Sequence, residues 1–177
     1  MTINPQLLKR FQKLALESLS GEWVLIGGVV LHLLNVHERL TLDIDLARKS
    51  GNRDETLELM KIADKLKLPP SAINQAGTFF LRQIPKWENK LVLLAESKSC
   101  RLYRPNGELY LQLKIARMSE SDLQDCLQMI RYCKRQGEKL DPKLLQHEIQ
   151  KHLRKAESAA CTKRLEQLSR TLQSAFP

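Results

Sequence analysis

The stretch IGGVVLHLLNVHERLTLDIDL, residues 26–46, decides the fold. Two adjacent glycines, Gly27 and Gly28, follow the end of an apolar run. A second apolar run closes the stretch and contains two aspartates one residue apart, Asp43 and Asp45. A segment that only packs into a hydrophobic core needs neither adjacent glycines nor paired aspartates. The elements that contain them therefore inform both the fold and the chemistry of the protein.

The residues around these two pairs predict a strand, a helix and a second strand. A short buried strand over 23–26 precedes the glycines, and the apolar spacing after them predicts a short helix over 29–36. Alternating apolar and polar residues predict a strand over 40–46. The stretch is therefore expected to form one α/β unit, with a tight turn between its first strand and its helix.

The strand over 40–46 is expected to present its acids side by side, because alternate side chains of a strand share one face. The apolar face is made of Leu42, Ile44 and Leu46, and the opposite face is made of Arg39, Thr41, Asp43 and Asp45. Cβ atoms two residues apart on one face are about 6.5 Å apart, so both carboxylates can bind one divalent cation or bridge two. Such hard oxygen ligands favour Mg²⁺ or Mn²⁺ over zinc.

The glycine pair supplies a complementary anion site. Gly27 and Gly28 lack the side chains that would keep a phosphate away from backbone N–H groups and from the positive end of the helix dipole. An anion site beside a metal site describes a nucleoside triphosphate with its Mg²⁺. The structural alternative is that Asp43 and Asp45 lie on the solvated face of a strand and that the glycines only form a turn.

Helical and strand patterns continue on both sides of this unit. Asn4 caps a helix that ends near Gly21, and a helix over 52–67 is closed by prolines. The expected apolar stripe of this second helix is Leu57, Met60, Ala63 and Leu66. Short strands over 91–95 and 100–103 bring the sheet to about four strands, and residues 71–90 are weakly patterned.

From Gly107 onward the chain is expected to be helical, although LYLQLKIA over 109–116 alternates with period two. Ser119 and Asp122 form a capping box, Gly137 ends that helix, and Asp141 opens the next. Two last apolar stripes can pack as a helical hairpin. We predict an α/β (α+β) fold with a small mixed sheet flanked by helices over residues 1–118, and a C-terminal helical bundle or hairpin over 119–177.

The charge of the chain predicts attraction to polyanions. It has 29 Lys and Arg against 20 Asp and Glu, a net charge of +9. Residues 131–177 hold eleven basic and five acidic residues, a net of +6, so the excess gathers near the C-terminus. Nucleic acid is the first candidate partner, and a merely soluble basic tail is the alternative.

Other classes are disfavoured by what the sequence lacks. No apolar run reaches the eighteen or so residues of a membrane span, and the N-terminus has no signal-peptide pattern, so we expect a cytoplasmic protein. The cysteines form no CxxC pair, and the histidines stand five apart in two pairs, a spacing that does not align two imidazoles on one helix face. We expect free thiols and no zinc site.

The combination of a strand, a glycine pair, a short helix and a strand with D-x-D resembles the nucleotidyltransferase superfamily. It looks most similar to AbiEii-type and related minimal prokaryotic nucleotidyltransferases, which carry the ending R-x-[ST]-x-D-[IL]-D-L. That ending is matched by Arg39, Thr41, Asp43, Asp45 and Leu46. The resemblance implies a nucleotidyltransferase-like domain over 1–118, with Arg39 and Thr41 among its nucleotide-binding residues.

The resemblance extends to two further residues. LYLQLKIARMSESDLQD resembles a later family helix with K-[LI]-x-A followed by D-x-x-D, matched by Lys114, Asp122 and Asp125, whereas Ser121 stands where the family has a basic residue. This match implies that Lys114 contacts the triphosphate; the alternative is a surface lysine on a helix. Active members carry a third carboxylate on a later strand, and in KLVLLAE only Glu96 could take that catalytic role.

Three candidate functions follow. The first is a metal-dependent nucleotidyltransferase that moves a nucleotidyl group from an NTP to an acceptor hydroxyl, with Mg²⁺ or Mn²⁺ at Asp43 and Asp45. The resemblance suggests RNA as the acceptor, with tRNA 3′ ends as one known type of target. It also suggests that the protein is the toxin of a toxin–antitoxin or phage-defence pair and that its partner is a cognate antitoxin. The second is a catalytically inactive protein of this fold that binds a nucleotide, RNA or a partner protein. A basic RNA-binding module on an α/β scaffold is a third.

Overall fold

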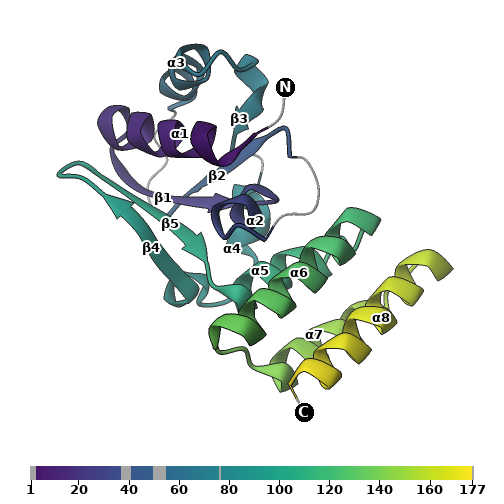
Figure 1. The fold of residues 1–177 in the computed structure, drawn as a ribbon. Helices are drawn as coiled ribbons and strands as arrows, with labels where there is room; N and C mark the ends of the chain where they lie inside the picture. The colour runs from purple at the N-terminus through teal and green to yellow at the C-terminus, as the bar shows by residue number, and fades with distance from the viewer. Residues whose placement is uncertain (1–2, 37–40, 50–54, 76, 177) are drawn as a thin grey trace. The chain divides into compact units, whose positions relative to one another are not determined.

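The computed structural model describes residues 3–36, 41–49, 55–75 and 77–176. It has a mixed α/β fold in which the described residues form one five-stranded sheet and eight α-helices, as the predicted class requires (Figure 1). The chain divides into two compact units, Met1–Pro105 and Asn106–Pro177. The sequence placed this boundary after residue 118; it falls earlier because the helix that begins at Gly107 packs against the C-terminal helices.

The sheet of the first unit has the strand order β3-β2-β1-β5-β4. Its strands are β1 (Gly21–Ile26), β2 (Ile44–Arg48), β3 (Ile73–Asn74), β4 (Leu91–Glu96) and β5 (Cys100–Pro105). The central strand β1 runs antiparallel to β2 and parallel to β5, while β3 is parallel to β2 and β4 is antiparallel to β5. All four predicted strands are present. The fifth, β3, has only two residues and is too short to produce a periodic pattern.

Four α-helices and two 3₁₀ turns complete the first unit: α1 (Pro5–Ser18), α2 (Val29–Leu33), α3 (Thr56–Lys65), α4 (Thr78–Arg82), η1 (Pro70–Ala72) and η2 (Trp87–Lys90). The expected cap of α1 is present, since the side chain of Asn4 accepts a hydrogen bond from the Leu7 N–H at 2.8 Å. The buried face of α1 packs against β5 and α3. This packing buries the apolar stripe of α1.

The core of the first unit is built around β1. Trp23, Val24 and Leu25 are fully buried, and each large apolar side chain removed from water in this way contributes roughly 1.5–3 kcal/mol before entropy is counted. The indole N–H of Trp23 donates to the Ser20 carbonyl at 2.9 Å, so its polar atom is satisfied. The same ring lies 5.2 Å from the Arg48 guanidinium, which pairs with the buried carboxylate of Glu55.

Two details of the predicted elements are wrong. The strand β2 begins at Ile44, and Leu42, assigned to its apolar face, is 60% exposed. In α3 the expected stripe residues Leu57 and Met60 are 61% and 44% exposed. Ala63 and Leu66 of the expected stripe are buried, but Leu59 and Ile62 are buried in place of Leu57 and Met60, because the sequence offers two apolar stripes and only one can face the core.

The C-terminal unit contains α5 (Gly107–Ile115), α6 (Glu120–Gln136), α7 (Pro142–Leu153) and α8 (Ala159–Ala175). The expected capping box of Ser119 and Asp122 is present, and Gly137 ends α6 in the left-handed conformation at φ 67°. Helices α7 and α8 form the expected hairpin, joined by the Ser169 hydroxyl donating to the Gln146 side chain at 2.7 Å (Figure 1). The segment with period two is helical, as predicted from its context.

None of the helices in the described parts of the chain combines the length and the apolar character that crossing a bilayer requires. None of the four cysteines, all of which lie within the described residues, forms a disulfide, and Cys100, Cys126 and Cys133 are buried. Burial raises the pKa of the Cys100 thiol to about 11 and also raises the pKa of Cys126. These buried thiols are therefore protonated at neutral pH and act as small apolar side chains.

Candidate functional site

The glycine bend and the second aspartate meet at one end of the sheet. Strand β1 ends at Ile26, which is opposite Asp45 in the antiparallel register with β2. Gly27 then turns the chain at φ +74°, a conformation that favours glycine, and its carbonyl accepts the Val30 N–H at 3.3 Å as α2 begins. A Cβ atom at Gly27 would overlap the Oδ2 atom of Asp45. The Asp45 carboxylate therefore points at the bend.

A row of three residues crosses the sheet at this end. Ile26 is opposite Asp45, and Asp45 is in register with Asn74 of β3. Register partners on neighbouring strands present their side chains on the same face, so the Asn74 amide stands one strand from the Asp45 carboxylate. The sequence does not point to Asn74, because β3 lies in the weakly patterned segment and no turn signal marks its register. Asn74 is a further oxygen donor beside the predicted metal ligands.

The first aspartate lies at the same end of β2. Asp43 comes immediately before the strand and is exposed, whereas Asp45 within the strand is half-buried. Both are thus near the bend that follows β1, with Asp43 open to solvent. Metal ions in phosphoryl-transfer sites keep several exchangeable ligands, so one half-buried and one exposed carboxylate suit such an ion.

Two further residues predicted to bind the nucleotide are Thr41 and Arg39. Thr41 is buried, and its carbonyl accepts the Ile3 N–H at 3.0 Å, which ties the start of the chain to the segment before β2. Arg39 lies outside the described residues. Gly28, in contrast, follows Gly27 directly and its carbonyl accepts the Leu31 N–H at 3.1 Å in the first turn of α2.

Glu96 lies at the other end of the sheet. It is opposite Arg101 in the register of β4 and β5, and Arg101 is in turn in register with Glu22 near the start of β1. Asp45 is opposite Ile26 of β1. Ile26 lies four residues beyond Glu22 on that strand, which corresponds to about 13 Å of extended chain. Glu96 forms an ion pair with Arg101 at 3.3 Å. The structure does not bring Glu96 to the bend, because the strand order and direction place its end of β4 away from it.

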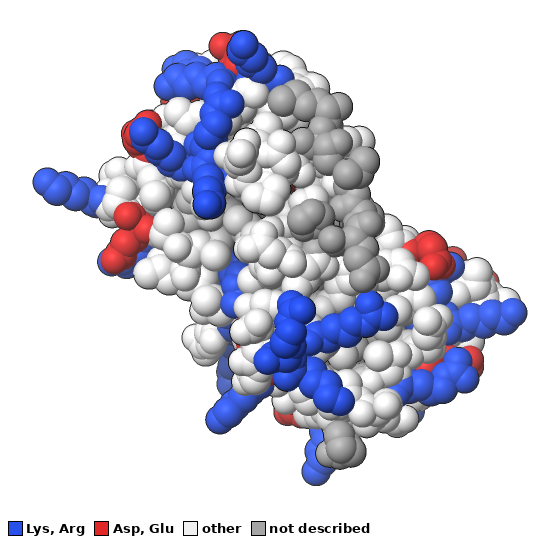
Figure 2. Space-filling model, in the orientation of Figure 1, with Lys and Arg blue, Asp and Glu red and all other residues white. Residues whose placement is uncertain are grey.

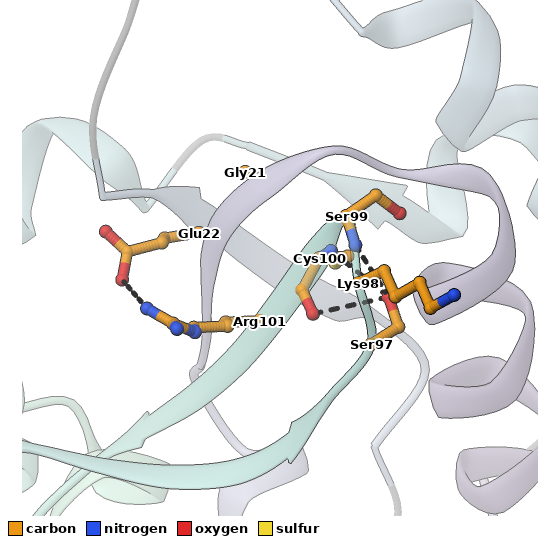
Figure 3. A pocket seen from close by; sticks show the side chains of 7 residues that line it. All are labelled: Gly21, Glu22, Ser97, Lys98, Ser99, Cys100 and Arg101. Atoms are coloured by element: carbon orange, nitrogen blue, oxygen red, sulfur yellow. Dashed lines mark hydrogen bonds and ion pairs between the residues drawn. The ribbon is translucent and has the colours of Figure 1, made fainter.

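The end of the sheet that holds Glu96 contains a hollow of about 200 Å³ lined by Gly21, Glu22 and the turn before β5 (Figure 3). The Glu22 carboxylate accepts hydrogen bonds from the Tyr103 hydroxyl at 2.8 Å and from the Lys49 ammonium at 3.1 Å. These bonds lower the pKa of Glu22 and raise that of Tyr103. Glu22 and Arg101, two charged residues that line this hollow, are thus already paired with neighbouring side chains, which indicates a structural role for them.

Lys114 is enclosed within the C-terminal unit. Its ammonium donates to Asp122 at 3.0 Å and to Asp125 at 2.8 Å, and all three residues are buried. The Arg117 guanidinium adds two bonds of 2.7 Å to Asp122. Burial alone would raise the pKa of Asp122, but the Arg117 hydrogen bond and the Lys114 charge hold that pKa well below its usual range. The ammonium is occupied, so Lys114 is neither an exposed surface lysine nor, in this arrangement, free to contact a triphosphate.

The donor set at the bend fits a hard divalent cation. No group of three His, Cys, Asp or Glu side chains that could hold a metal alone exists among the described residues. Mg²⁺ is usually held by one or two carboxylates together with substrate phosphates and water, so a pair of aspartates is sufficient when a triphosphate is bound. Asp43 and Asp45 would hold the ion, and Asn74 would extend the same oxygen-rich edge.

The comparisons with known proteins agree with this arrangement at the level of family. A family model described as a nucleotidyltransferase of unknown function (DUF6036) matches residues 5–167. The match includes the glycine bend, both aspartates and the Lys114 network. Comparison with curated proteins and with solved structures gave no significant match.

Proposed function

The chain belongs to this family of nucleotidyltransferases (DUF6036), and on that premise we propose that it transfers a nucleotidyl group from an NTP to an acceptor hydroxyl with a divalent cation at Asp43 and Asp45. The observation that carries the proposal is the contact of the Asp45 carboxylate with the bend at Gly27. That contact joins a metal ligand to a stretch of backbone without a side chain. A metal-bound triphosphate needs both features within a few ångströms.

Each residue has a stated task in this reaction. Asp43 and Asp45 would hold the cation, which when bound would supply neutralisation of the phosphate charge and activation of the acceptor hydroxyl. Gly27 and Gly28 leave room for the β- and γ-phosphates to reach backbone N–H groups. The acceptor oxygen attacks the α-phosphorus, the bond to the bridging oxygen breaks, pyrophosphate leaves, and the hydroxyl proton passes to solvent. Positioning and charge neutralisation thus account for most of the catalysis.

We further propose RNA as the acceptor. The C-terminal helices have an excess of basic side chains, and Figure 2 shows Lys and Arg outnumbering Asp and Glu over their visible face. A surface of this charge attracts the phosphate backbone without regard to sequence. The resemblance of the D-x-D segment to AbiEii-type proteins supports tRNA as the RNA, a toxin role and a neutralising antitoxin partner. Mg²⁺ or Mn²⁺ is the expected cofactor.

One observation favours a second function. Glu96, the expected third carboxylate, lies at the other end of the sheet, and the row beside Asp45 supplies the neutral amide of Asn74 instead. Without a carboxylate base the protein could bind a nucleotide and not transfer it. The second candidate is therefore a nucleotide-binding protein of this fold that lacks catalysis.

The test is incubation with each labelled NTP, Mg²⁺ and bulk RNA. We expect label on RNA with the wild-type protein and at least about a hundredfold less with Asp43→Asn or Asp45→Asn, since one catalytic metal contact is worth several kcal/mol. Asp64→Asn is the matched control, because Asp64 is an exposed aspartate on α3. Nucleotide binding without any transfer by the wild type would support the second candidate, and equal transfer by all variants would overturn the proposed metal site.

A further inference from the structure

A crevice of about 380 Å³ opens between α3 and the segment that contains η1 and β3. Leu59 and Ile73 are buried and form apolar walls, and Pro70 adds a third apolar surface. Met60 also lines the crevice, yet it is 44% exposed. The volume falls in the range of small-ligand pockets, and an unbranched, adaptable thioether at the mouth can close over a flat ligand.

The polar groups of the crevice are neutral. Ser71, Asn74 and Gln75 lie along it, with Thr56 at the start of α3. Of the described residues that line the crevice, none is charged. A lining of this kind is unsuited to a phosphate, which takes cations or clustered N–H donors. It suits a ligand with apolar faces and a hydrogen-bonding edge, because amide groups both donate and accept.

The crevice adjoins the proposed metal site. Asn74 lines it and is the register partner of Asp45, so the two backbones are one interstrand spacing apart, about 5 Å. A nucleoside triphosphate whose phosphates lie at Asp45 and Gly27 would have to place its base past this edge of the sheet to enter the crevice. The proposed binding groups for the phosphates are at the bend, and the crevice beside the bend offers an uncharged surface for the rest of the nucleotide.

We propose that the crevice between α3 and β3 binds the nucleobase of the incoming nucleoside triphosphate. This inference rests on the proposed function of the neighbouring site. Met60 and Leu59 contact the faces of the base, and the side chain of Gln75 meets its hydrogen-bonding edge, which makes Gln75 the residue that selects among bases.

The experiment measures the Kd of three Mg²⁺-bound probes by calorimetry: inorganic tripolyphosphate, non-hydrolysable analogues of all four NTPs, and the free nucleosides. Met60→Ala removes a wall of the crevice, and Leu57→Ala is the matched control, because Leu57 is an exposed apolar residue on the same helix that does not line the crevice. Gln75→Leu keeps the size of the side chain and removes its amide.

We expect the best-bound NTP analogue to bind the wild type about tenfold or more tightly than tripolyphosphate, since a buried base adds roughly 1.4 kcal/mol or more. Met60→Ala should weaken nucleotide binding about three- to tenfold and leave tripolyphosphate unchanged, with no effect of Leu57→Ala. Gln75→Leu should change the order of preference among the four bases.

The outcomes separate this inference from the function it rests on. If nucleotides bind the wild type but Met60→Ala and Gln75→Leu change neither affinity nor base preference, the crevice is not the base site and the proposed function stands. If neither tripolyphosphate nor any NTP analogue binds, the proposed function itself fails. If Leu57→Ala weakens binding as much as Met60→Ala, the effect belongs to the helix and the base site is overturned.

Discussion

The Asp45 carboxylate occupies the space beside Gly27 in which any side chain at residue 27 would have to lie. The pairing of β1 with β2 brings the two residues together, because Asp45 is opposite the residue before the glycine. Gly27 therefore has two independent reasons to be glycine, its positive φ and the neighbouring carboxylate. Both the fold and the proposed chemistry depend on this contact.

Replacing Gly27 with alanine should cost more than backbone strain. A left-handed φ alone costs an alanine roughly 1–2 kcal/mol, and the new Cβ would also displace the Asp45 carboxylate. We expect Gly27→Ala to lower the free energy of unfolding in urea by about 2–4 kcal/mol and to abolish nucleotidyl transfer.

Gly137→Ala is the control for that variant. Gly137 has φ +67° at the end of α6, and nothing lies within 4 Å of the position its Cβ would take. This variant should lose only the backbone contribution of about 1 kcal/mol and keep full activity. Equal losses of stability and activity for the two alanines would mean that the carboxylate does not matter at the bend.

Lys114 should prove to be a structural residue. Lys114→Met would leave the Asp122 and Asp125 carboxylates buried without their shared cation, at a cost of about 3–5 kcal/mol in the free energy of unfolding. Lys134→Met, at an exposed position of α6, should change stability by less than about 0.5 kcal/mol. A Lys114→Met protein of wild-type stability that no longer binds nucleotide would instead identify Lys114 as a triphosphate ligand.

The same network should make stability depend on acid. The pKa of Asp122 is lower in the folded state than its usual value of about 3.9, so the folded state favours the ionised form. Its contribution is therefore complete above that usual pKa and is lost as the pH falls below it. Urea unfolding from pH 7 to pH 2.5 should show Asp122→Asn less stable than the wild type at neutral pH, with the difference shrinking in acid. A difference independent of pH would contradict this assignment.

RNA binding should depend on salt and on the basic C-terminal helices. Arg154 and Lys155 are exposed at the end of α7, and replacing both with glutamine should weaken RNA binding. If both contact phosphates of single-stranded RNA, the slope of log K against log salt should shrink by about 1.4. Lys61→Gln with Lys65→Gln on α3 is the matched control, since both are exposed lysines of the other unit. Equal effects of the two double variants would indicate attraction by net charge alone.

The local parts of the fold were predictable because their causes are local. The caps at Asn4, Ser119 and Gly137 and the alternation around Asp45 each act within a few residues. The same is true of the glycine bend, whose backbone needs a residue without a side chain.

The remaining features depend on how distant strands pair. Asn74 joined the row of Asp45 through the register of a two-residue strand, which has no periodicity of its own. Glu96 was misplaced because the direction of β4 and its position beyond β5 decide which end of the sheet it reaches. The buried ion pairs of Lys114 arise from the packing of α5 on α6, and the sequence around Lys114 alone does not distinguish them from the contacts of an exposed lysine.

The most direct test of the central claim is a crystal structure with Mn²⁺ and a non-hydrolysable triphosphate, in which anomalous scattering locates the metal. We expect the metal to lie about 2.1 Å from carboxylate oxygens of Asp43 and Asp45, with phosphate oxygens completing its ligands and the phosphates against the backbone of Gly27. Triphosphate bound with its metal away from both aspartates, or on residues distant from the bend, would contradict the account.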